Sequence, residues 1–303
     1  MYDTLITVPQ LQALMNDKAR LMVFDCSFDL MKPEAGPAAY LEAHIPGAVY
    51  ANLDTALSAR HGLPGRDGQV VVAQEAGQPA SGGRHPLPSR ESFATWLSSV
   101  GFANDMQAVV YDRNGANYCG RLWWMLQWAG HGAAAVLDGG LQAWQAAGHP
   151  LAQGEEPAHF QSNFVLQPPR VALVGTQQVA ARLDDAAGQT LIDARAAARY
   201  RGEVEPLDPI AGHIPGALNR PFSENLGPDG RFKPAAQLRA EFEALLAGRD
   251  PATVVHHCGS GVSAVPNVLA MRIAGLGDTA LYAGSWSEWS NTPSLPVRQG
   301  AQA

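Results

Sequence analysis

One short loop gathers the residues that could do chemistry, Cys258, Gly259, Ser260, Gly261, Val262 and Ser263. It follows an apolar run at 253–257 and precedes a helical pattern that starts near Ala264. The glycines let the backbone curl without side-chain clashes, so that successive N–H groups can point inward. Such a ring of donors at the start of a helix binds anions. The anion held there would be the Cys258 thiolate, so the loop predicts a nucleophilic cysteine.

The other two cysteines, Cys26 and Cys119, do not stand in such a loop. Cys26 follows an apolar run and Cys119 lies at a predicted helix start, and we interpret both as small packing residues. An odd, sparse set of cysteines does not fit a disulfide framework, and none are close enough in sequence for a zinc knuckle. The sequence therefore predicts no metal site.

The chain repeats its own pattern, which defines two halves. The segment AHIPGAVYANLD around His44 returns as GHIPGALNRPFS around His213, and the motifs before and after it recur in the same order. A polar, proline-bearing stretch separates the halves. We predict a first domain at 1–150, a linker at 151–170 and a second domain at 171–303.

Short apolar runs alternate with amphipathic patterns in each half. The runs predict buried strands at 21–24, 108–111, 135–137, 190–192, 253–257 and 279–282. Helical spacing predicts helices at 89–101, 120–130, 235–248 and 263–275. This alternation indicates an α/β fold, with a mostly parallel sheet covered by helices on both faces in each half.

Several conspicuous side chains have matched positions in the two halves or lie on strands, and we predict structural roles for them: Trp123, Trp124, Trp286, Trp289, His44, His213, His256 and His257. The repeat aligns Arg113 with Cys258, so only the second half carries the nucleophile. The first half also holds a Gly- and Pro-rich insertion that includes 60–88, which we predict to be a long loop.

Composition narrows the function further. Of the 303 residues 46% are hydrophobic and 16% are charged, and the formal net charge is −7. Such a chain can build a core, offers no basic field for nucleic acid, and contains no apolar stretch long enough to span a membrane. The first residues do not read as a signal peptide, so we expect a soluble, cytoplasmic protein.

The paired HIPGA turns, the RYRG segment, the CGSGVSA loop and the GSWSEWSNTP ending occur here in order. Over nearly the whole chain they resemble the tandem-domain rhodanese-like sulfurtransferases. The resemblance implies an inactive first domain, a catalytic second domain and an active site at their interface. A sulfane sulfur would pass from a small-molecule donor to Cys258, leaving a persulfide, and then to cyanide or a thiol. No cofactor is implied, and a thioredoxin-like reductant is an implied partner.

The loop also indicates the donor. Members that use thiosulfate place basic residues after the cysteine, whereas CGSGVS is neutral and resembles the loop of mercaptopyruvate sulfurtransferases. In that branch a loop serine works with a histidine and an aspartate, which match Ser260, His85 and Asp54. The backbone N–H groups of Gly259 to Ser263, through Gly261 and Val262, would bind the transferred sulfur.

The donor-binding arginines match only in part. Arg199 of RYRG fits the first arginine of the branch, but Leu207 and Asp208 stand where the second is expected. Arg201 could replace it, or Arg199 and Arg201 could both be structural and pair with Glu203 or Glu205 at the surface. Thiosulfate or another persulfide therefore stays open as an alternative donor.

Two other classes of function remain as alternatives. A cysteine-dependent phosphatase would have an arginine at the end of the loop to bind phosphate, where this chain has Ala264. A non-catalytic sulfur carrier would have the same cysteine without turnover.

Overall fold

The computed structural model of the protein describes residues 1–59, 78–185 and 187–301, so the predicted loop lies outside the described residues as far as residue 77. The contacts divide the chain into two compact units. Unit 1 holds residues 1–80, 87–170 and 228–231, and unit 2 holds residues 81–86, 171–227 and 232–303. The segment 81–86, which the sequence prediction assigned to the first domain, thus belongs to unit 2.

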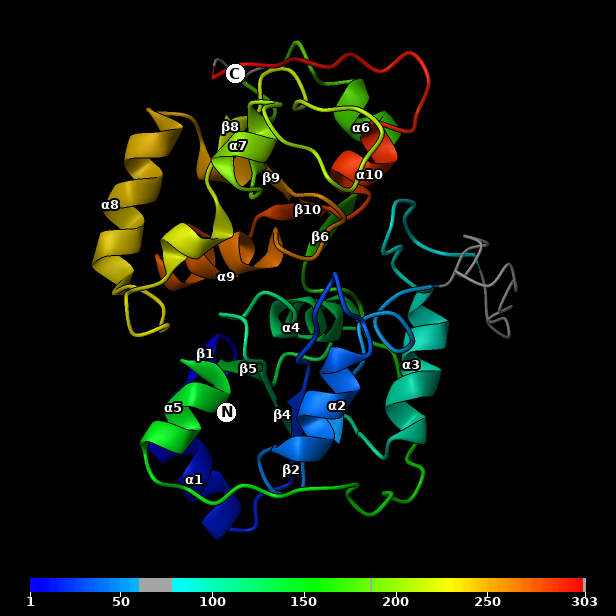
Figure 1. Cartoon of the computed structure of the whole chain (residues 1–303), viewed down its shortest axis with the longest axis vertical. Helices are drawn as coiled ribbons and strands as arrows, with labels where there is room; N and C mark the ends of the chain where they lie inside the picture. The colour runs from blue at the N-terminus through cyan, green and yellow to red at the C-terminus, as the bar shows by residue number, and fades with distance from the viewer. Residues whose placement is uncertain (60–77, 186, 302–303) are drawn as a thin grey trace. The chain divides into compact units, whose positions relative to one another are not determined.

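Unit 1 is built on a parallel sheet of five strands in the order β1-β5-β4-β2-β3 (Figure 1). Its elements are β1 (Leu5–Ile6), α1 (Val8–Asn16), β2 (Leu21–Asp25), α2 (Ala35–Glu42), β3 (Val49–Tyr50), α3 (Arg90–Ser99), β4 (Gln107–Tyr111), α4 (Cys119–Trp128), β5 (Ala134–Leu137) and α5 (Gly140–Ala146). The first helix begins at a capping box, in which Thr7 and Gln10 each accept a hydrogen bond from the other's backbone N–H.

Unit 2 repeats this topology with a parallel five-stranded sheet in the order β6-β10-β9-β7-β8. Its elements are β6 (Ala172–Val174), α6 (Thr176–Ala180), β7 (Thr190–Asp193), α7 (Ala197–Tyr200), β8 (Leu218–Asn219), the 3-10 helix η1 (Phe222–Asn225), α8 (Ala235–Leu246), the 3-10 helix η2 (Pro251–Thr253), β9 (Val254–His257), α9 (Val265–Ile273), β10 (Ala280–Tyr282) and α10 (Ser285–Trp289). β9 is the central strand, so the residue after it lies at the middle of the sheet edge.

Helices cover both faces of each sheet. Connections between parallel strands are right-handed. Where the strand order reverses along the sheet, the connecting helices therefore pack on the opposite face. In unit 1, Val23 packs in the core cluster with Leu11 of α1, whereas its neighbour Phe24 lies 6.0 Å from Trp96 of α3 between ring centroids. Consecutive strand residues thus meet helices on opposite faces, and the predicted α/β fold is confirmed.

The residues predicted to have structural roles lie in the interior. The four tryptophans Trp123, Trp124, Trp286 and Trp289 are buried. His44 and His213 are also buried, and each ring stacks on a tyrosine whose backbone carbonyl oxygen lies 2.8 Å from its Nδ1. These histidines therefore hold the HIPG turns in place in both units.

The strand register corrects the alignment of the repeats. The last residue of β2 lies opposite Tyr111, and the last residue of β7 lies opposite His257. The next residue along the chain is Asp112 in unit 1 and Cys258 in unit 2. The prediction that Arg113 stands at the position of Cys258 is therefore wrong by one residue. It fails because α4 has 10 residues and α9 has 9, so an alignment carried through from the later motifs is one residue out of step in the loop.

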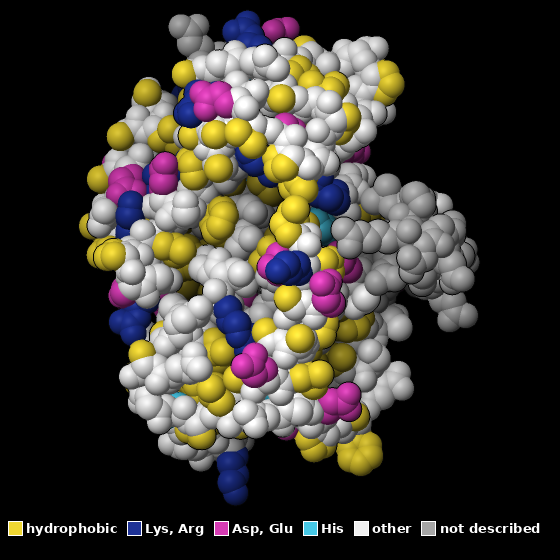
Figure 2. Space-filling model, in the orientation of Figure 1, with side chains coloured by type: hydrophobic (Ala, Val, Ile, Leu, Met, Phe, Trp, Pro, Cys, Tyr) yellow, Lys and Arg dark blue, Asp and Glu magenta, His cyan; other side chains and the backbone are white. Residues whose placement is uncertain are grey.

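Charges of both signs mix on the surface. On the face drawn in Figure 2, the coloured Lys and Arg side chains lie scattered, several of them next to Asp or Glu. Among the helices of the described ranges, none is long and apolar enough to cross a membrane.

Candidate active site

Cys258 lies at the carboxyl end of the central strand of unit 2. It follows β9 directly, and 1% of its surface is exposed. The start of α10 holds its backbone: the Cys258 N–H donates to Ser285 Oγ at 3.1 Å, and the Trp286 N–H donates to the Cys258 carbonyl oxygen at 2.9 Å. Both backbone groups of Cys258 are therefore bonded, which holds the main chain from which the thiol projects.

The loop after Cys258 curls as the glycines predict. Gly261 has a φ of +74°, and a Cβ atom there would lie 2.2 Å from the carbonyl oxygen of Ala283, so only glycine fits. Within the described ranges, the N–H groups of Gly259, Ser260, Val262 and Ser263 donate to no other protein group. An anion attached to Cys258 could accept from them.

Ser260 and His85, which the sequence predicts to act together, meet in unit 2. His85 Nδ1 lies 2.7 Å from Ser260 Oγ, and both residues are buried. Asp54, the predicted third member, lies in unit 1 after β3, where its N–H donates to Asn52 Oδ1 at 2.8 Å. Its role with Ser260 and His85 stays a prediction.

Backbone contacts hold the segment 81–86 that carries His85. The Arg84 N–H donates to Ser287 Oγ at 3.0 Å. A Cβ atom on Gly83 would lie 2.6 Å from the carbonyl oxygen of Gly284, so the two backbones approach more closely than any side chain would allow. The segment therefore lies directly against the start of α10.

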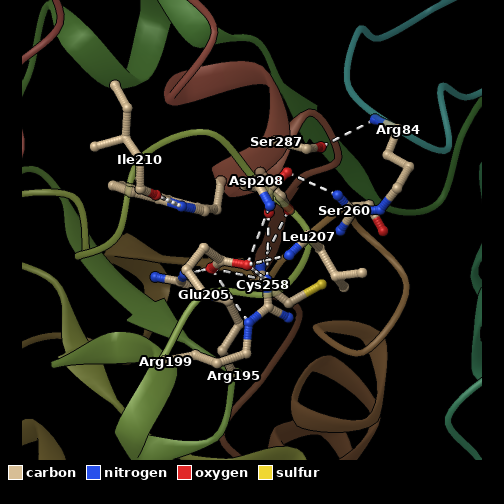
Figure 3. A network of polar contacts seen from close by, with 12 residues as sticks. Arg84, Arg195, Arg199, Glu205, Leu207, Asp208, Ile210, Cys258, Ser260 and Ser287 are labelled. Atoms are coloured by element: carbon tan, nitrogen blue, oxygen red, sulfur yellow. Dashed lines mark hydrogen bonds and ion pairs between the residues drawn. The ribbon is translucent and has the colours of Figure 1, made fainter. Parts of the chain in front are cut away.

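Arg199 shares a carboxylate with an arginine that sequence reasoning missed. Arg199 Nη2 lies 2.7 Å from Glu205 Oε1 and 3.3 Å from Asp208 Oδ2. Arg84 Nη1 lies 2.7 Å from the other oxygen of the same carboxylate, Asp208 Oδ1. Figure 3 shows the network that these residues form. The sequence contains one signal for Arg84. Asp208 is an acid where the mercaptopyruvate sulfurtransferases have an arginine, and a buried acid needs a basic partner.

Arg195 is a second residue that sequence reasoning missed. Its side chain is 1% exposed, donates from Nη2 to Asp193 Oδ2 at 2.7 Å, and lies over the Trp286 ring. Burial alone would raise the pKa of Asp193, but the charges of Arg195 and His257 hold it below its usual value. This ion pair lies at the end of β7, where Asp193 is opposite His257 of β9.

Arg201, a candidate donor-binding residue, pairs with a neighbour at the surface. Its Nε donates to Glu203 Oε1 at 2.6 Å, and its side chain is 35% exposed. Arg201 thus forms the surface pair that the sequence left open as the alternative to donor binding.

The histidines of β9 and the other cysteines are buried. Burial, with a smaller contribution from its neighbour His257, lowers the pKa of His256 to about 3. Burial also lowers the pKa of His257, although Asp193 opposes the shift. It raises the pKa of the Cys26 and Cys119 thiols well above the usual value. These two thiols therefore stay protonated at neutral pH and suit packing.

The equivalent loop of unit 1 carries its own anion. Asp112 follows β4, and its carboxylate accepts hydrogen bonds of 2.8 to 3.0 Å from four backbone N–H groups, those of Asn114, Ala116, Tyr118 and Cys119. Burial raises the pKa of Asp112, and these four bonds oppose the shift. In unit 1 the N–H groups of the loop are therefore bonded to a side chain of the same loop.

No metal centre accompanies the site in the part of the chain that the structure describes, where no three His, Cys, Asp or Glu side chains are placed to hold an ion. Cys258, Ser260, His85 and three arginines thus converge in unit 2. This arrangement can position an anionic molecule beside a thiol and move a proton between a hydroxyl and an imidazole.

Comparison with known proteins agrees with the two-fold repeat. The rhodanese-like domain model matches residues 7–147 and 176–292. A Pseudomonas aeruginosa protein named "Probable 3-mercaptopyruvate sulfurtransferase" is 44% identical over 98% of each chain. Bovine thiosulfate sulfurtransferase is 33% identical over 92% of this chain and 89% of its own.

Solved structures have the same fold. The Escherichia coli 3-mercaptopyruvate sulfotransferase SseA is 29% identical and covers 94% of this chain and 100% of its own, with a TM-score of 0.76. The family model and these full-length relatives show that the chain belongs to the rhodanese family and is a sulfurtransferase with two tandem domains.

Proposed function

We propose that the protein transfers a sulfane sulfur from 3-mercaptopyruvate to a thiol or cyanide through a persulfide on Cys258. One observation carries the proposal. Cys258 opens a neutral loop whose N–H groups at Gly259, Ser260, Val262 and Ser263 have no protein acceptor within the described ranges, so a charged sulfur bound to Cys258 would find donors there.

The first step loads the cysteine. The Cys258 thiolate attacks the sulfur of 3-mercaptopyruvate, an S–S bond forms and the C–S bond breaks. The electron pair of that bond goes to the carbon, which takes the proton that the donor thiol carried, so that pyruvate leaves. Ser260, hydrogen-bonded to His85 Nδ1 at 2.7 Å, is placed to move this proton. Asp54 would orient His85 in the same relay.

The second step unloads it. An acceptor thiolate or cyanide attacks the outer sulfur of the persulfide, the S–S bond breaks, and its electron pair returns to Cys258 as the thiolate. We extend this step to a thioredoxin-like reductant as acceptor. The loop N–H groups stabilise the charge on sulfur in both steps.

Thiosulfate is the second candidate donor, because the bovine relative is named for it and three arginines surround the site. A side-by-side measurement of kcat/KM decides between the two donors. We expect a preference for 3-mercaptopyruvate, with one sulfur atom added to the protein by mass spectrometry when the donor is present without acceptor.

Cys258→Ser is the control for the mechanism, and it should transfer no sulfur from either donor. Transfer retained in this variant would contradict the Cys258 persulfide. A preference for thiosulfate would contradict the donor alone. Sulfur uptake without turnover would favour a non-catalytic sulfur carrier.

A further inference from the structure

Two guanidinium groups face the same point beside the nucleophile. A Cβ atom placed on Gly259 would lie 3.3 Å from Arg84 Nη2 and 3.4 Å from Arg199 Nη1. Glycine leaves that point open, and it directly follows Cys258 in the chain. The two arginines come from positions far apart in the sequence, yet both belong to unit 2.

The N–H groups that face this point have no acceptor. Arg84 donates to Asp208 from Nη1, and Arg199 donates to Glu205 and Asp208 from Nε and Nη2. Among the described residues nothing accepts from Arg84 Nη2 or Arg199 Nη1, and Arg84 Nε is buried without a partner. A buried N–H without a partner costs free energy, which applies to Arg84 Nε. The two Nη groups belong to partly exposed side chains and are available to a ligand at this point.

Asp208 accounts for the spacing of the pair. Its side chain is 2% exposed, and one oxygen binds each arginine, so the two like charges are held together by a carboxylate between them. It stands where the related branch has its second arginine. The Asp208 carboxylate instead binds Arg84, which brings a second guanidinium group to the side of Arg199.

We propose that Arg84 is the second donor-binding residue and forms with Arg199 a clamp for the carboxylate of the sulfur donor. This inference rests on the proposed function, since it names the group of the donor that the site recognises. A carboxylate at this point could accept from Arg84 Nη2 with one oxygen and from Arg199 Nη1 with the other, and both hydrogen bonds would be charge-assisted. The sulfur of a short oxo acid would then reach Cys258.

The charge balance favours a monoanion. The network contains three cations and three anions, Arg84, Arg195, Arg199, Asp193, Glu205 and Asp208. Before a donor binds, its formal charge is zero, so a carboxylate is recognised by directed hydrogen bonds instead of by excess positive charge. A dianion such as thiosulfate would bring a second uncompensated charge into a buried site.

Kinetics with a matched pair of donors tests the clamp. Mercaptoacetone has the thiol and the ketone of 3-mercaptopyruvate but no carboxylate. Arg84→Ala should raise the KM for 3-mercaptopyruvate about 10- to 100-fold with little change in kcat, since a charged hydrogen bond is lost. It should change kcat/KM for mercaptoacetone much less. Arg84→Lys, which keeps the charge without the fork, should fall between.

Controls separate binding from folding. Arg239→Ala removes an exposed arginine of α8 that pairs with Glu243 and should leave both donors unchanged. Arg84→Ala also leaves Asp208 with one partner, so the double variant Arg84→Ala, Asp208→Asn removes that charge as well and should still show the raised KM. Equal losses with both donors, or a fall in kcat alone, would assign Arg84 a structural role and overturn the clamp.

The product pyruvate provides a readout that does not depend on the donor. Its inhibition constant against whichever donor the wild type uses should rise in Arg84→Ala by the same factor as the KM. If the wild type uses thiosulfate and not 3-mercaptopyruvate, the proposed donor fails, and pyruvate inhibition still judges the clamp. An unchanged inhibition constant would overturn it.

Discussion

The loops after the central strands of the two sheets begin at equivalent positions and differ in what their N–H groups bind. In unit 1, Asp112 accepts from four N–H groups of its own loop. In unit 2, Cys258 stands at that position, and loop N–H groups point at no acceptor among the described residues. The Asp112 carboxylate accepts these bonds in unit 1, and we propose that the sulfur attached to Cys258 accepts them in unit 2. The loop of unit 1 is therefore part of the core, and the loop of unit 2 is the binding site that we propose.

A second difference lies in the arginine that binds the acid at the end of the neighbouring strand. In unit 1 this is Arg113, the residue after Asp112. Its Nη1 donates to Asp25 Oδ2 at 3.0 Å, and its Nη2 donates to the carbonyl oxygen of Ala43, just before the HIPG turn. The loop itself thus supplies the cation in unit 1.

In unit 2 the same task is done from another element. Arg195 Nη2 donates to Asp193 Oδ2 at 2.7 Å and to the carbonyl oxygen of Gly212, again just before the HIPG turn, at 2.6 Å. The position after Cys258 is then free to be Gly259. With the arginine at the strand end, this position has no side chain, at the point where we propose that the donor carboxylate binds.

Exchanging Cys258 for the residue that unit 1 has at this position tests the comparison most strongly. Cys258→Asp should lower sulfur transfer on the order of 10⁴-fold or more, because no nucleophile remains. The new carboxylate should accept from the loop as Asp112 does. We therefore expect this variant to be about 1–3 kcal/mol more stable than Cys258→Ser in urea unfolding.

The comparison with Cys258→Ser isolates the carboxylate, because both variants lack the thiol. If Cys258→Asp is the less stable of the two, the loop of unit 2 is not built like the loop of unit 1, and the equivalence drawn from the strand register fails.

Removing the internal anion of unit 1 should destabilise that unit. Asp112→Ala leaves four buried N–H groups without their acceptor, and we expect a loss of about 3–5 kcal/mol in the free energy of unfolding. Asp112→Asn keeps one acceptor oxygen and should lose less. Chemical unfolding of both variants measures the difference. Equal losses would show that the hydrogen bonds do not decide the effect.

The central strands also differ in their response to acid. His256 of β9 occupies the position that Val110 has in β4. Burial lowers the pKa of His256 from 6.5 to about 3, so the unfolded chain binds a proton that the folded chain refuses. Stability from this residue is complete above pH 6.5 and falls as the pH drops toward 3.

Between pH 7.5 and pH 5, His256→Val should therefore lose about 2 kcal/mol less stability than the wild type. Urea unfolding at the two pH values measures this slope. His159→Val, at an exposed position, is the matched control and should behave like the wild type. Identical slopes for all three proteins would contradict the buried, neutral His256.

Much of the fold follows from the sequence because its signals are local. Apolar runs such as 108–111 and 190–192 predict strands that the structure contains, and the duplicated HIPG turns predict two copies of one sheet. The strands β3 and β8 have two residues each, too few for any periodic pattern to show. The register of the loop was missed because one extra residue in a helix shifts an alignment without changing its motifs.

The site could be predicted only where a motif names a residue. The motifs identified Cys258, Ser260, His85 and Arg199 as candidates. Arg84 and its partner Asp208 are 124 residues apart, and no local pattern connects them. An arginine looks the same in sequence whether it is buried or exposed. Asp208, an acid where the related branch has an arginine, was the only sequence signal. Its meaning became clear from the structure, in which it pairs with Arg84.

Residues 81–86 belong to unit 2 although the residues on either side of them belong to unit 1. No single cut in the chain therefore separates the two units. A protein cut at residue 171 would keep Cys258 and lose both Arg84 and His85, although each half would retain a complete sheet. The duplication therefore yields two sheets, but the residues that we propose to act with Cys258 come from both halves of the chain. Adding the first half as a separate chain would be the way to restore the missing side chains.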